Sequence, residues 1–445
     1  MNLTIVYVLI CIQALGVILQ LKVWKVRALL SPGFYFSIIW FLGGVGLLVF
    51  HSLGLMVEYK IGYIDELNIL ISFTGLCFIL FVGLYRGKVK DNHIVNISFI
   101  SYFRVFKGIA VFYLLLALFV FSTEGSGLDF TTARENMHKT LENRSFLVGY
   151  FRLLSLPLSI YAGSRLVMIL KGKNKVRISI YFYLLLPLIA DTLFSFTEGG
   201  RVAMVYTMVM YLVGGVLTLP INFNFKEYKK IILNALFFAL IINSAISWVA
   251  SVRTIGGKAL AKREMIKEKL GPFSFTYGAI EYIQSSYVGY QFRRVDAVDE
   301  TTLGYGMYTF NGFINWQIPF ASRFGIEKSS IADAFDIYYF NQESYDFKRN
   351  YYYVTHSNYL TIIKDFGFRG AFVAIFFIVL LSHILFVRIQ TKKNIKYAAT
   401  FFMFYLFFNY WTKSNFFGSL SDSVMNTLYS MLIVDIYNFI SKKRS

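Results

Sequence analysis

Long apolar segments recur along this chain, and their length constrains its fold more than any other feature of the sequence. A helix that crosses a membrane needs about 20 mostly apolar residues, because each residue adds about 1.5 Å along the helix axis. Backbone groups in lipid must also form hydrogen bonds within their own segment, which favours helices for runs of this length. We predict about eleven transmembrane helices, near residues 3–21, 33–56, 67–85, 106–122, 146–170, 178–196, 202–220, 231–252, 371–387, 397–412 and 423–440.

The amino-acid composition also indicates a membrane protein. Hydrophobic residues make up 56% of the 445 residues and charged residues 16%, whereas soluble domains are about 45–50% apolar and about 25% charged. Residues 1–21 lack a basic start and a small-residue cleavage site, so we expect a retained first helix and not a signal peptide. Cys11 and Cys77 both lie in apolar runs, which indicates neither a disulfide framework nor a zinc site.

Basic and less basic connections alternate between the predicted helices. The basic set carries 22 lysines and arginines against 2 acidic residues, and lies near 22–31, 86–107, 171–177, 221–230, 388–396 and 442–444. The other set carries 6 basic and 9 acidic residues, and lies near 57–66, 123–145, 197–201 and 413–422. The positive-inside rule places the basic set in the cytoplasm, with the N-terminus outside and the C-terminus inside. This set accounts for the net charge of +19, so we expect contact with anionic lipid and no nucleic-acid partner.

One long connection divides the chain into three parts. We expect helices 1 to 8 in residues 1–252, a large external loop in 253–355, and a re-entry segment with the last three helices in 356–445. The loop holds about 12 basic and 11 acidic residues, and a connection of this length is usually functional. Within it, residues 258–270 have the pattern of a basic amphipathic helix, either on lipid head groups or on a solvated surface.

Several charged residues lie near the predicted outer ends of the helices. Arg152 lies about a turn or two inside the fifth helix, and Asp191 lies in the outer third of the sixth. Arg201 begins the seventh helix after two glycines, and Arg253 ends the eighth. Charges inside a membrane are costly and indicate a functional site, although a structural Arg152–Asp191 pair and arginine snorkelling are the alternatives. Arg201 also stands where helix N-terminal amides favour anions.

The sharpest local pattern begins where the long loop returns to the membrane. It consists of Thr355, His356-Ser357-Asn358-Tyr359-Leu360 and then Asp365-Phe366-Gly367-Phe368-Arg369-Gly370. If 356–366 is helical, His356 shares a face with Leu360 and Ile363, which would point it toward an outer cavity. Histidine is the side chain best suited to accept a proton near neutral pH, and a hydrogen-bonded structural histidine is the alternative.

These motifs resemble the O-antigen and oligosaccharide repeat-unit polymerases of the Wzy type, and more distantly the O-antigen ligases. In these families a His-Asn/Ser-x-x-Leu segment and an Asp/Glu-x-Gly-x-x-Gly turn close the large periplasmic loop. The corresponding residues here are 356–360 and 365–370. Two further similarities are Glu198-Gly199-Gly200-Arg201 opening a helix and the aromatic stretch 277–282. Many members have about twelve or more spans with both termini inside, which differs from the prediction for this chain.

The resemblance implies an all-α, polytopic fold of the glycosyltransferase C type with one large periplasmic loop, in the bacterial inner membrane. It implies an enzyme that joins oligosaccharide units carried on undecaprenyl diphosphate at the outer face of that membrane. A chain-length regulator and a flippase are candidate partners. O-antigen and capsular polysaccharide both remain open as the product.

We therefore assign a role to each candidate site residue. His356 is the expected base for the attacking sugar hydroxyl. Arginines suit the diphosphate through their planar fork of donors, and the candidates are Arg201, Arg253, Arg152, Arg293 and Arg294. The expected supporting residues are Asp191, Thr355, Asn358 and Asp365. No metal ion and no cofactor is expected.

Two other functions are compatible with the same sequence. An O-antigen ligase would transfer the glycan to lipid A-core by similar chemistry. A transporter or flippase of a lipid-linked glycan would need access from both sides of the membrane and no single base. The glycan made by a strain lacking the protein distinguishes the three.

Overall fold

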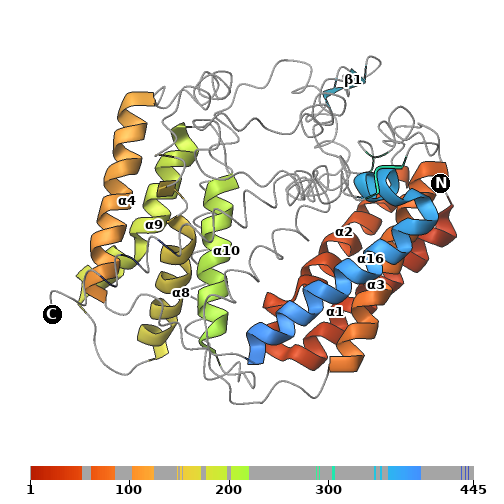
Figure 1. Cartoon of the computed structure of the whole chain (residues 1–445), viewed down its shortest axis with the longest axis horizontal. Coiled ribbons are helices and arrows are strands. Elements are labelled where there is room, and N and C mark those ends of the chain that lie inside the picture. The colour runs from red at the N-terminus through yellow and green to blue at the C-terminus, as the bar shows by residue number, and fades with distance from the viewer. Residues whose placement is uncertain are drawn as a thin grey trace.

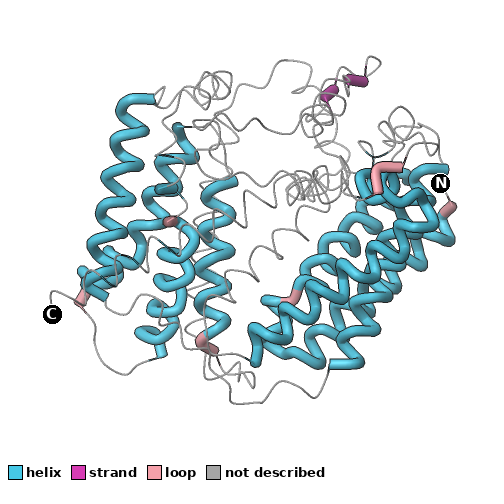
Figure 2. The backbone as a smooth tube through the Cα atoms, viewed as in Figure 1, coloured by secondary structure: helices cyan, strands magenta, loops and turns pink. Residues whose placement is uncertain are grey.

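The computed structural model describes part of the chain, in segments separated by gaps. The described residues are 2–52, 62–85, 103–124, 148, 151–152, 154–171, 177–197, 202–219, 287, 290, 303–305, 345–346, 351–352, 359–391, 432, 436 and 439. They are almost entirely helical, as Figure 2 shows, apart from an antiparallel ladder of β1 (Tyr345–Asp346) and β2 (Tyr351–Tyr352). The described part is therefore that of a polytopic α-helical membrane protein, as the sequence predicts.

The helices follow the predicted spans closely. They are α1 (Leu3–Trp24), the 3-10 helix η1 (Lys25–Leu30), α2 (Pro32–Ser52), α3 (Gly62–Tyr85), α4 (Phe103–Glu124), α8 (Ser155–Lys171), α9 (Ile178–Thr197), α10 (Val202–Leu217) and α16 (Tyr359–Thr391). Among the described residues, six segments are long and apolar enough to cross a membrane: Leu3–Leu30, Pro32–Val49, Tyr63–Leu84, Phe103–Thr123, Ile178–Thr197 and Ile362–Val387. The predicted spans 231–252 and 397–412 lie outside the described residues, so the total of eleven stays a prediction.

The described helices form two groups (Figure 1). In the first group α1 packs on α2 and α3, and α16 packs on α3; in the second, α4 packs on α9, and α8 packs on α9 and α10. The α8–α10 contact is close, because a Cβ on Gly163 or Gly214 would collide with the backbone of Tyr211 or Ile160 on the facing helix. Small residues let helix backbones approach in this way where no hydrophobic effect drives helices together in lipid.

Hydrogen bonds at the helix ends place the starts of α1 and α3 on the same side. The predicted alternation of connections between the two sides of the membrane requires this arrangement. The Asn2 side chain caps α1 by accepting from the Thr4 N–H at 3.0 Å, as N-cap residues do. The Asn2 N–H donates to both carboxylate oxygens of Asp65, at 2.9 and 3.1 Å, so α1 and α3 begin on the same side. Which side faces the cytoplasm stays a prediction.

The two groups meet at one end, where η1 packs on α10. The sequence assigns Arg27 to a cytoplasmic connection, but the structure buries its side chain in η1. Its guanidinium donates to the carbonyl oxygens of Leu217 and Leu219 at 3.0 Å each. These carbonyls end α10, so Arg27 caps the negative end of that helix. Figure 1 shows α10 and α16 ending near each other at the bottom of the view.

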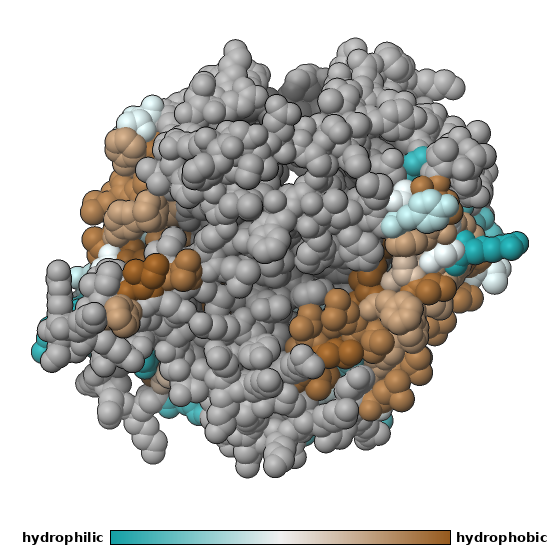
Figure 3. Space-filling model, viewed as in Figure 1, coloured by the Kyte–Doolittle hydropathy of each residue, from teal (hydrophilic) through white to brown (hydrophobic). Residues whose placement is uncertain are grey.

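Apolar side chains cover the outer surfaces of both groups. Leu115 and Phe119 of α4 are 58% and 59% exposed, and Val373 and Phe377 of α16 are 60% and 61% exposed. Figure 3 shows hydrophobic side chains over the described helices on both sides of the view. Such surfaces are expected where helices face lipid.

Candidate functional site

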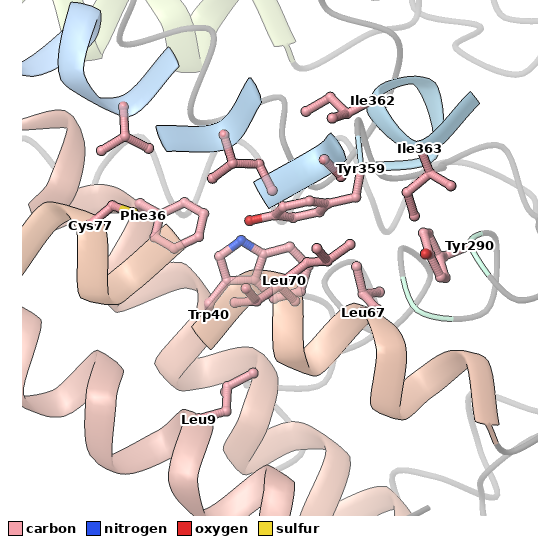
Figure 4. Close-up of a cluster of buried hydrophobic side chains, with 14 of the residues drawn as sticks. Leu9, Phe36, Trp40, Leu67, Leu70, Cys77, Tyr290, Tyr359, Ile362 and Ile363 are labelled. Atoms are coloured by element: carbon pink, nitrogen blue, oxygen red, sulfur yellow. The ribbon is translucent and has the colours of Figure 1, made fainter. Parts of the chain in front are cut away.

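The segment that follows the long loop enters the first helix group at Tyr359. The predicted span 371–387 begins earlier in the structure, at Ile362, and α16 itself begins at Tyr359. Leu360 and Ile363, which the sequence places on one helix face, both lie in the core of the first group, and Figure 4 shows Ile363 there. The predicted base His356 and its neighbours Thr355 and Asn358 lie outside the described residues, so their roles stay predictions.

Tyr359 ties this re-entry point to α3. Its ring is fully buried, and its hydroxyl lies 2.8 Å from the hydroxyl of Thr74. Thr74 already donates its own proton to the carbonyl oxygen of Leu70 at 2.8 Å. The Tyr359 hydroxyl therefore donates to Thr74, and both buried hydroxyls have a partner, as buried polar groups require.

The Asp-x-Gly-x-x-Gly motif forms a break inside α16. Gly367 has φ +68° and ψ 171°, a conformation available essentially only to glycine. A break interrupts the helical bonding pattern and leaves carbonyl oxygens in need of donors. The carbonyl oxygens of Lys364 and Asp365 accept from the N–H groups of Gly304 and Tyr305, at 3.2 and 3.0 Å. The motif therefore forms a break in the helix, and the backbone N–H groups of Gly304 and Tyr305 supply the missing donors.

Two tyrosines of the long loop are buried in the first group, which the sequence analysis did not foresee. Tyr287 packs edge-on against Trp40 of α2, with ring centroids 5.4 Å apart. The Tyr290 hydroxyl donates to Glu66 of α3 at 2.5 Å. Burial raises the pKa of Tyr287 above its ordinary value, so its hydroxyl stays neutral. The only available signal was two aromatic residues spaced by three, a spacing that places them on one face of a helix.

A polar cluster lies inside the second group, centred on the predicted supporting residue Asp191. Asp191 is 2% exposed, and its carboxylate accepts from one hydroxyl on each of three neighbouring helices. Tyr113 of α4 donates to Oδ1 at 2.5 Å. Ser155 of α8 and Thr207 of α10 both donate to Oδ2. Hydrogen bonds to a charged acceptor are roughly twice as strong as neutral ones, so these donors stabilise negative charge at Asp191.

Arg152 is the one predicted diphosphate ligand among the described residues, and it lies beside this cluster. Its guanidinium carbon stands 5.0 Å from the centroid of the Phe194 ring, a cation–π contact. It is also near enough for its charge to interact with that of Asp191. The structure therefore brings Arg152 and Asp191 together. The predicted residues Arg201, Arg253, Arg293 and Arg294 lie outside the described residues.

The remaining predicted supporting residue, Asp365, lies at the break in α16. Its side chain is fully buried, and it lines an open groove of about 620 Å³ that continues along α16. The other lining residues are Leu303, Tyr305, Phe366, Gly370, Val373, Ala374, Phe377, Ile378 and Leu381. Nearly all of this lining is apolar.

Comparisons with models of protein families, with curated proteins and with solved structures gave no match. An assignment of function therefore rests on the residues and their geometry.

Proposed function

We propose that this protein polymerises oligosaccharide units carried on undecaprenyl diphosphate, at the outer face of the bacterial inner membrane. The observation that carries the proposal is the break at Gly367. The motif that resembles the polymerase signature forms a turn of its own, and the long connection docks on that turn through Gly304 and Tyr305. A signature that arose by chance inside a membrane span would have no reason to interrupt the helix.

The reaction needs a base, an acceptor hydroxyl and a stabilised leaving group. The acceptor hydroxyl of one lipid-linked unit attacks the anomeric carbon of the glycan on a second lipid diphosphate. The new glycosidic bond forms as the bond from that carbon to the diphosphate oxygen breaks, and the diphosphate leaves with the electron pair. The hydroxyl proton passes to His356, for which the sequence resemblance is the support.

The cluster around Asp191 supports this chemistry through Arg152. A charged residue in a membrane domain is costly to keep, which favours a functional role. The Arg152 guanidinium lies over the ring of Phe194, within electrostatic range of Asp191. A guanidinium held in place suits a leaving diphosphate, because fixed donors stabilise developing charge without reorganising.

The decisive experiment uses purified protein in lipid with a defined undecaprenyl-diphosphate-linked repeat unit. We expect a ladder of products that lengthens with time, and release of lipid diphosphate. The variants His356→Ala and His356→Gln should both lose this activity, because loss of a general base typically costs about 10²–10⁴-fold in rate. Normal polymerisation by His356→Gln would mean that His356 is not the base.

A strain that lacks the protein distinguishes the proposed function from its alternatives. Loss of a polymerase leaves single repeat units attached to the core. Loss of a ligase leaves long chains that are unattached, and loss of a flippase leaves the units on the inner side. Either of the last two phenotypes would contradict the proposal.

A further inference from the structure

The groove along α16 has the position and lining of a site for a lipid chain. It begins at the break, where Tyr305 and Asp365 lie, and runs along the helix to Leu381. The stretch between Asp365 and Leu381 belongs to the membrane-crossing segment Ile362–Val387. The groove therefore runs in the direction in which a lipid chain crosses a membrane.

The side chains of the groove are arranged as on a helix that faces lipid on one side. Val373, Phe377 and Leu381 recur every four residues and are 60%, 61% and 50% exposed. Between them and the core lie Gly370 and Ala374, whose small size hollows the surface. A volume of about 620 Å³ is within the usual range for small-molecule sites, about 300–1,000 Å³.

Charged residues of both signs stand at the end of this groove where α16 breaks. Lys364 and Arg369 lie on either side of Gly367, Arg369 is exposed, and Asp365 lines the groove itself. The sequence of the helix carries no charged residue from Gly370 to Val387. Two cations against one acid leave this end net positive, which matches a lipid whose anionic phosphate lies at the membrane surface and whose chain extends into the membrane.

We propose that this groove binds the isoprenoid chain of the lipid diphosphate, with the diphosphate near Lys364 and Arg369. This inference rests on the proposed function for the identity of the lipid. A single chain fits a groove on one helix better than the paired acyl chains of a phospholipid. The long connection would then reach the diphosphate directly, because Tyr305 lines the same end of the groove.

The first test measures retention of undecaprenyl diphosphate by native mass spectrometry of the purified protein, with phosphatidylglycerol as competitor. The variant Ala374→Phe fills the groove and should lower retention of the isoprenoid lipid about tenfold, a difference of about 1.4 kcal/mol. The matched control is Gly83→Phe on α3, where an added Cβ would meet no atom of the described residues within 4 Å. It should retain the lipid as the unaltered protein does.

The second test does not require the Ala374→Phe variant, with its filled groove, to fold. A photoreactive amino acid replaces Phe377 in the groove, or the 52% exposed Leu80 of α3 as a control. We expect crosslinks to undecaprenyl diphosphate from position 377 and not from position 80. Crosslinks from 377 to phosphatidylglycerol, to a second copy of the protein or to another segment of the same chain would overturn the proposal.

The two proposals fail in different ways. Polymer formation without an isoprenoid crosslink at 377, and without an effect of Ala374→Phe on retention, would refute the groove alone. Isoprenoid binding at the groove without polymer formation would refute the proposed reaction and leave the groove as a lipid site.

Discussion

Replacing Gly367 by alanine tests whether the break in α16 is built into the fold. The residue has φ +68° and ψ 171°, a region that costs a residue with a Cβ about 1–3 kcal/mol. Among the described residues a Cβ at this position would meet Leu303 Cδ2 alone, at 3.8 Å, an ordinary van der Waals contact that adds no steric cost. We therefore expect Gly367→Ala to lower the free energy of unfolding by about 1–3 kcal/mol.

The control for this substitution is Gly83→Ala on α3. Gly83 lies in a helix, and a Cβ there would meet nothing within 4 Å in the part of the chain that the structure describes. Alanine is better than glycine in a helix by about 1 kcal/mol, so this variant should be unchanged or more stable. The two variants should therefore change the free energy of unfolding in opposite directions. This difference separates backbone strain at Gly367 from any general effect of adding a methyl group.

The assay is equilibrium unfolding in mixed micelles of a mild detergent and dodecyl sulfate, followed by tryptophan fluorescence. Trp40 lies beside Tyr287 and close to Tyr359, so its emission reports on this region of the first group (Figure 4). Equal midpoints for Gly367→Ala and Gly83→Ala would refute the reasoning. The segment would then be able to continue as an unbroken helix, and the docking of Gly304 and Tyr305 would be incidental.

Three further predictions follow from other parts of the molecule. Tyr113→Phe removes one donor from the buried Asp191 carboxylate and should cost about 1–3 kcal/mol of stability in the same unfolding assay; an unchanged midpoint would mean that water replaces the hydroxyl. Arg27→Ala should destabilise the protein more than Arg27→Lys, because lysine keeps a charge at the end of α10 although it loses the planar guanidinium, one nitrogen of which donates both hydrogen bonds. Equal losses would exclude a capping role. Reporter fusions should place 171–177 in the cytoplasm and 253–355 outside; a cytoplasmic signal from the latter would remove the site from the outer face.

The features that the sequence could predict are those that depend on local pattern. Hydropathy alone pointed to the six segments in the described part of the chain that are long and apolar enough to cross a membrane, because the length of an apolar run depends on the membrane and not on neighbouring helices. Helical spacing predicted that Leu360 and Ile363 share a face, but not that this face packs into the core of the first group. The motif 365–370 drew attention through its two glycines, and the structure shows that Gly367 has a conformation that glycine adopts most readily.

The Asp191 cluster shows what local pattern could not reveal. Asp191 itself was noticed because a charge is conspicuous in an apolar run, but Ser155 and Thr207 are ordinary residues in membrane helices. Their importance comes from the faces that α8 and α10 turn toward α9, which side-chain packing decides. The burial of Arg27 could not be foreseen for the same reason, since its partner carbonyls lie far away in the chain.

The order in which the cluster is synthesised bears on how the protein enters the membrane. An aspartate near the centre of a helix opposes insertion by about 2.5–3.5 kcal/mol. Tyr113 and Ser155 precede Asp191 in the chain, so two of its three hydroxyl partners have already been made when α9 leaves the ribosome. Only Thr207 arrives later. Helices α4 and α8 can therefore offer hydrogen-bond donors to Asp191 as α9 enters the membrane. Helix α10 supplies the last donor of the cluster afterwards.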